Sequence, residues 1–190
     1  FPSGGTWYLW CDGAYGAENS EDIVSSPASA VVNVKESAAA RQPQDVSAVL
    51  NATMAKLADT VTEPAFGTNA GEWTILSLAR GGYFEKDNAY FNDYYDRIVA
   101  TVNEKAASVS LANGALHKSK STDNSRLIIA LSSIGKDATS VGDWNLITPY
   151  EDFSWIKKQG LNGTVFALIA LDTNNYQTAD TTIRQQCIDD

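Results

Sequence analysis

Residues of the kinds used in nucleophilic or metal-dependent catalysis are scarce in this 190-residue sequence, which contains one histidine and two cysteines. His117 lies in a polar loop, while Cys11 and Cys187 lie near opposite ends of the chain and form no C-x-x-C pair. A zinc site needs several Cys, His or carboxylate ligands, and a Ser or Cys triad needs a histidine that a third group orients. We therefore expect no metal and no cofactor. For the cysteines, two free thiols and one long disulfide both remain open.

A second group of residues has the chemistry of a binding site, because polar and aromatic side chains recur at the starts of three predicted helices. Such side chains could hold a sugar, a peptide or an extended ligand. In the alternative interpretation they are structural: Trp73 belongs to the core, Arg126 pairs with a nearby acid, and Asn162 satisfies backbone groups. The candidate ligand-binding residues are Glu72, Trp73, Asp123, Asn124, Arg126, Gln159 and Asn162.

The charge balance excludes several classes of partner. Lys and Arg number 14 against 23 Asp and Glu, which gives a formal charge of −9. A basic face for nucleic acid is therefore not expected, and an anionic membrane surface is disfavoured. The longest apolar stretch, around residues 165–171, is too short for membrane insertion.

Hydrophobic periodicity divides the chain into two parts. Residues 1–44 contain two β-like runs, 6–11 and 30–35, and we interpret them as an arm or as the tail of an upstream β-domain. Residues 45–190 have a helical period and form the second predicted domain, whose last helix we expect to be truncated at the C-terminus. We expect the nearly all-apolar helix 162–171 to be buried on every side. One apolar stripe on the first predicted helix comprises Val46, Val49, Leu50, Leu57 and Val61. The predicted helices cover residues 46–63, 71–80, 87–110, 122–134, 146–155, 162–171 and 179–190.

Three of these helices resemble one another. Each carries small residues beside Leu and ends in Gly or a polar turn, at residues 77–82, 130–135 and 167–172. Helix pairs that recur at such intervals are typical of an α-solenoid or a closed ring of hairpins. An irregular helical bundle is the alternative.

Three sequence blocks carry a more specific resemblance. The first covers residues 62–73 and 78–83, the second 121–126 and 130–137, and the third 145–146, 158–163 and 166–172. Together they resemble the prenyltransferase/squalene-oxidase-type repeats of large surface proteins of Gram-positive bacteria. The resemblance implies an α/α-toroid of concentric helices, of which this mainly α chain would form about half. It also implies an extracellular location, secreted or at the bacterial cell surface.

Asp123 is the candidate catalytic residue that the resemblance implies. Triterpene cyclases begin their reaction at a DxDD-type cluster in which the middle Asp is the acid, and this element falls on residues 121–124. Asp123 remains, but both flanking acids are replaced. A lone Asp at a helix N-terminus is stabilised as the anion, and the alternative role of Asp123 is an N-cap.

Two functions follow as hypotheses. The first is a non-catalytic module of a secreted or wall-attached protein that binds a small molecule, a glycan or a protein. The second is an enzyme similar to isoprenoid cyclases or prenyltransferases, with Asp123 as its acid. The missing acids, and the absence of paired zinc ligands around His117, favour the first. We also expect the rest of a parent chain or a second copy to complete the ring.

Overall fold

The computed structural model describes residues 5–11, 28–34, 46–68, 70–108 and 114–190. These belong to two units, residues 1–45 and residues 46–190. In the first unit, β1 (Gly5–Cys11) pairs antiparallel with β2 (Ala28–Val34), and Tyr8 lies opposite Val31. The side chain of Cys11 is outside the described part of the chain.

The second unit is built from helices, which confirms the prediction of a mainly α protein. No described helix is long and apolar enough to cross a membrane. The helices are α1 (Val46–Thr60), α2 (Glu72–Arg80), α3 (Ala89–Ser108), α4 (Ser121–Ser133), α5 (Phe153–Lys157), α6 (Leu161–Thr173) and α7 (Ile183–Asp189), with a 3₁₀ turn, η1 (Thr148–Glu151), before α5.

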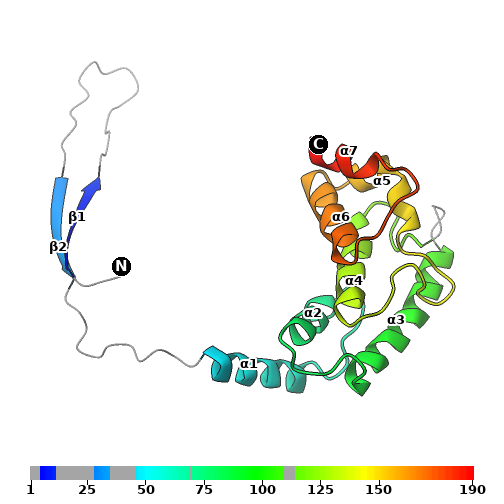
Figure 1. The fold of residues 1–190 in the computed structure, drawn as a ribbon, viewed down its shortest axis with the longest axis horizontal. Helices are drawn as coiled ribbons and strands as arrows, with labels where there is room; N and C mark the ends of the chain where they lie inside the picture. Colours follow the sequence, from blue (N-terminus) through cyan, green and yellow to red (C-terminus); the bar gives the residue numbers. More distant parts are fainter. Residues whose placement is uncertain (1–4, 12–27, 35–45, 69, 109–113) are drawn as a thin grey trace, which may run out of the picture. The chain divides into compact units, whose positions relative to one another are not determined.

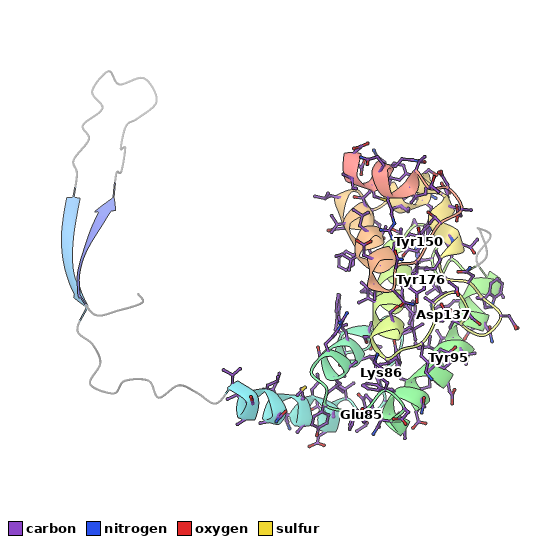
Figure 2. All side chains as sticks on the ribbon, viewed as in Figure 1. Glu85, Lys86, Tyr95, Asp137, Tyr150 and Tyr176 are labelled. Carbon is purple, nitrogen blue, oxygen red and sulfur yellow. The ribbon has the colours of Figure 1, made fainter. Side chains whose placement is uncertain are left out.

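Helix α4 lies at the centre of this unit, between α2 and α6 (Figure 1). It is buried on nearly every side, and Leu127, Ile128 and Leu131 have no exposed surface. Two tyrosines from later segments bind it from the side (Figure 2): the Tyr150 hydroxyl shares a 2.7 Å hydrogen bond with Ser125, and the Tyr176 hydroxyl shares one of 3.1 Å with Ser132.

Helix α3 contributes one face to the same core. Phe91, Tyr94, Ile98 and Val102 recur at intervals of three or four residues and are all buried. The hydroxyl oxygen of Tyr94 is buried and has no hydrogen-bond partner among the described residues. Tyr94 therefore contributes to this core through its apolar ring, whereas the hydroxyls of Tyr90 and Tyr95 on α3 donate to the carbonyls of Val61 and Ser140.

Helices α2, α4 and α6 end in the same way. In each, a residue with positive φ follows the helix, at Gly82 (+65°), Gly135 (+77°) and Asn175 (+53°). Positive φ there lets the chain turn back onto the last carbonyl groups, as in the Schellman motif. The N–H of the next residue donates to the carbonyl of a buried leucine: Tyr83 to Leu78 at 3.0 Å, Lys136 to Leu131 at 2.9 Å and Tyr176 to Leu171 at 2.8 Å.

This shared ending changes how α6 aligns with α2 and α4. The sequence pattern aligns Leu168 with Leu78 and Leu131, whereas the structure puts Leu171 in their place. Leu171 is fully buried and Leu168 only partly. Helix α6 contains two Ala–Leu pairs, 167–168 and 170–171, which look alike in sequence. Only the turn at Asn175 shows which pair corresponds to the ends of α2 and α4.

One expectation about burial is wrong, that for helix α6. Helix α6 packs on α4 and buries Gly163, Thr164 and Ala167. On the other face, Leu161, Val165 and Ile169 are 69%, 42% and 46% exposed. Residues at intervals of four share one helix face, and no described segment covers this one. In α1, Val46, Val49 and Leu50 of the apolar stripe are exposed, Leu57 is partly buried against the core, and only Met54 is buried.

Candidate functional site

A polar hollow of about 480 Å³ lies at the start of α4. Four segments form it: the loop before α2, the later part of α3, the first turns of α4 and the residue pair before α6. Since the segments at the starts of α2, α4 and α6 meet here, these helices begin at the same side of the unit. The lining residues are Phe66, Gly67, Lys105, Lys120, Thr122, Asp123, Arg126 and Gln159.

Asp123 and Arg126 form an ion pair inside this hollow. Their spacing of three residues puts both side chains on one face of α4, and Arg126 Nη2 donates to Asp123 Oδ1 at 2.7 Å. Both side chains are partly buried. Asp123 lies in the first turn of the helix and makes no capping bond, so the predicted N-cap role is wrong.

Gln159 supplies the cap that α4 does not make from its own sequence. The helix begins after Lys120, which gives no side-chain cap. Gln159 Oε1 accepts hydrogen bonds from the backbone N–H of Thr122 at 2.9 Å and from Ser121 Oγ at 3.3 Å. Gln159 therefore joins the segment before α6 to the first turn of α4 and forms part of the wall of the hollow.

Positive charge predominates in the lining. Lys105, Lys120 and Arg126 face a single lining carboxylate, that of Asp123. Lys105 Nζ lies 5.4 Å from the centroid of the Phe66 ring, a cation–π contact. In a chain of charge −9, these residues form a local cationic surface.

Glu72 lies just behind the wall of the hollow and is 1% exposed. Its Oε1 accepts a 2.8 Å hydrogen bond from the N–H of Gly67, a lining residue. Burial raises the pKa of the Glu72 carboxyl, while the Gly67 hydrogen bond and the charge of Arg126 act in the opposite direction. Glu72 thus orients the loop that forms one wall and is itself shielded from solvent.

The other predicted site residues lie elsewhere or serve the fold. Asn124 is buried and bonds three backbone groups: it accepts from Leu116 N–H at 2.9 Å and donates to the carbonyls of Gly114 at 2.7 Å and Leu146 at 3.3 Å. Trp73 is 43% exposed and meets Phe166 edge to face, with centroids 6.4 Å apart. Asn162 is exposed in the first turn of α6 and does not line the hollow.

The structure therefore brings together three of the seven predicted site residues, Asp123, Arg126 and Gln159. Sequence reasoning missed the five other lining residues. Phe66 and Gly67 lie inside the first repeat block, and Lys120 and Thr122 flank or begin the second, so their positions carried a signal. The position of Lys105 carried no signal, because it is one of many polar residues along α3.

The arrangement is suited to binding. Ammonium, guanidinium, hydroxyl and amide groups converge on one hollow, whose volume is within the usual range of small-molecule pockets. The described residues contain no group of three His, Cys, Asp or Glu placed to hold a metal ion. Cys187 is a buried free thiol.

No known protein-family model, curated protein or solved structure matches the chain.

Proposed function

We propose that the helical unit is a non-catalytic ligand-binding module and that it binds a small polar ligand in the hollow at the start of α4. The observation that carries the proposal is the convergence of Lys105, Lys120, Arg126 and Gln159 on one hollow from three separate parts of the chain. The walls are already held in place, by the Gln159–Thr122 bond on one side and the Glu72–Gly67 bond on the other. Preorganised walls reduce the entropy lost when a ligand binds.

The alternative, an isoprenoid cyclase-like enzyme with Asp123 as its acid, fits this geometry less well. A protonating acid of that kind needs an apolar surrounding that favours the neutral carboxyl group. Asp123 is instead ion-paired with Arg126 and shares its hollow with two ammonium groups. The same hollow offers one aromatic ring, that of Phe66, to a hydrocarbon substrate.

For the architecture, we propose repeats of an α/α-toroid, of which this unit forms about half. The support is the common ending of α2, α4 and α6 at Leu78, Leu131 and Leu171, together with the meeting of their starts at one hollow. The exposed apolar face of α6 is where the rest of a parent chain or a second copy would continue the ring. The repeat resemblance and the acidic composition support a secreted or cell-surface location in a Gram-positive bacterium.

The test is an NMR titration of the whole chain with a panel of neutral sugars, dipeptides, organic acids and phosphates. We expect at least one compound to shift the backbone amides of Gly67, Thr122 and Asp123 in a saturable manner. The same protein incubated with squalene and isoprenoid diphosphates should give no product. Turnover that Asp123→Asn abolishes would establish the alternative, and a panel that never shifts these amides would contradict the proposal.

A further inference from the structure

We infer that the ligand of the α4 hollow carries a phosphate group, which lies among Lys105, Lys120 and Arg126. This inference rests on the proposed binding function and names the ligand class of the same site. It starts from the charge that the hollow carries in an otherwise acidic chain.

The three cations come from two parts of the chain, α3 and the start of α4. Lys105 is near the end of α3, Lys120 immediately precedes α4, and Arg126 is in its second turn. Within a chain of charge −9, three cations around one hollow are not expected from composition alone. Their arrival from separate elements also means that no single helix face accounts for the cluster.

Only one of the three charges is neutralised by a described neighbour. Arg126 pairs with Asp123, whereas neither Lys105 nor Lys120 forms a salt bridge with any residue in the described part of the chain. Lys105 is held over the Phe66 ring, which orients the ammonium group without cancelling its charge. The lining is left with a net charge of about +2, which a dianion complements.

The geometry favours a phosphate over a carboxylate. A phosphate monoester carries close to two negative charges at neutral pH and presents three acceptor oxygens in different directions. A carboxylate has one charge and two oxygens in a plane. Cationic groups that approach from two segments, α3 and the start of α4, with Thr122 beside them, match the three phosphate oxygens better than the planar carboxylate. Phe66 offers an apolar surface to the remainder of the molecule.

The first experiment is a calorimetric and NMR titration of the full chain at constant ionic strength with inorganic phosphate, glucose 6-phosphate, glucose and citrate. We expect both phosphates to bind and to shift the amides of Gly67 and Thr122, and glucose to have no effect. Tighter binding of glucose 6-phosphate than of phosphate would assign the site to an organic phosphate, and equal affinities would assign it to the free ion.

The outcomes separate this inference from the function on which it rests. If glucose or citrate shifts the hollow amides and neither phosphate does, the inference is wrong and the binding function stands. If none of these four compounds shifts them but a dipeptide or another member of the wider panel does, the inference is again wrong and the binding function stands. If no compound of either panel shifts them, both fail.

Charge-altering variants test the location. Lys105→Gln and Lys120→Gln should each weaken phosphate binding by about tenfold, the usual range for losing a hydrogen bond to a charged group. Lys118→Gln is the matched control, because it removes the same charge two residues away from an exposed side chain that does not line the hollow. Asp123→Asn should tighten binding, since it removes the one competing carboxylate. The inference would be overturned if Lys118→Gln and Lys120→Gln lost equal phosphate affinity, or if Asp123→Asn bound phosphate more weakly.

Discussion

The side-chain oxygen of Gln159 accepts a hydrogen bond from the backbone N–H of Thr122 at 2.9 Å, so the first turn of α4 is capped from a segment 37 residues later in the chain. A helix usually obtains this bond from its own N-cap side chain. Here a tertiary contact takes that role. It links the starts of α4 and α6 and shapes the hollow between them.

Replacing Gln159 should therefore destabilise the unit as the loss of an N-cap does. We expect Gln159→Ala to lower the free energy of unfolding by about 1 kcal/mol, measured by urea denaturation followed by circular dichroism. Gln159→Glu keeps the acceptor oxygen and should be close to wild type in stability. If Gln159→Ala unfolds at the wild-type midpoint, α4 does not depend on this cap.

Asn124 should be among the most sensitive positions in the chain. Its side chain satisfies the N–H of Leu116 and the carbonyls of Gly114 and Leu146, all in a buried setting. Asn124→Ala leaves these groups without partners, and we expect a loss of about 3 kcal/mol or more in unfolding free energy. The control is Asn51→Ala, an exposed position in α1, which should change stability by less than about 0.5 kcal/mol.

Gly163 is required by the close packing of α6 near its start. A Cβ at this position would lie 2.0 Å from the carbonyl oxygen of Ile156, a backbone atom that can move away only if the chain shifts. We expect Gly163→Ala to cost about 1–3 kcal/mol in thermal unfolding, the range for overpacked cores. Asn162→Ala, exposed and one residue earlier, provides the comparison and should be nearly neutral. A Gly163→Ala protein as stable as Asn162→Ala would contradict the packing described here.

The carboxyl groups of Glu72 and Asp152 should make the stability of the folded protein depend on pH in opposite directions. Burial raises the pKa of Glu72 in the folded state above its unfolded value, so the folded protein holds that proton more tightly. Its contribution to stability is therefore fully present at low pH and declines as the pH rises through the raised pKa. Glu72→Gln removes this titration and keeps an acceptor for the Gly67 N–H. We expect the stability difference, variant minus wild type, to increase from about pH 4 to pH 8.

Asp152 provides the contrast. It is the N-cap of α5. Hydrogen bonds from the Ser154 side chain, and then from the backbone N–H groups of Trp155 and Ser154, lower its pKa. Its contribution is present at neutral pH and is lost as the pH falls through the lowered pKa. Asp152→Asn should therefore become less stable than wild type as the pH rises. Urea denaturation of the wild type, Glu72→Gln and Asp152→Asn at several pH values measures how each stability difference from wild type changes with pH. Changes of the same sign in the two variants would refute the opposite roles given to Glu72 and Asp152.

Much of the secondary structure could be predicted from local chemistry. Periodic apolar residues define α2, α3, α4 and α6, and Gly82 and Gly135 mark where two of them end. The boundaries agree within a few residues, because helix propensity and turn glycines act over short distances along the chain.

The site could be predicted only in part. The sequence identifies Asp123, Arg126 and Gln159 because they lie at helix starts. Asn124 also lies at a helix start, but its side chain points inward and bonds backbone groups. Lys105 could not be found, since it reaches the hollow from α3 through the fold. The apolar face of α6 was expected in the core because sequence hydrophobicity does not specify which segment will cover it.

The sequence by itself determined the helical class, the ends of α2 and α4 and a pool of polar residues from which a site could form. Only the tertiary structure decided that Asp123 is ion-paired rather than a cap, that Leu171 rather than Leu168 closes the third repeat, and that positive charge gathers in one hollow of an acidic chain. The reason is physical: backbone turns follow from neighbouring residues, whereas burial, desolvation and charge balance depend on segments that are distant in sequence and adjacent in space.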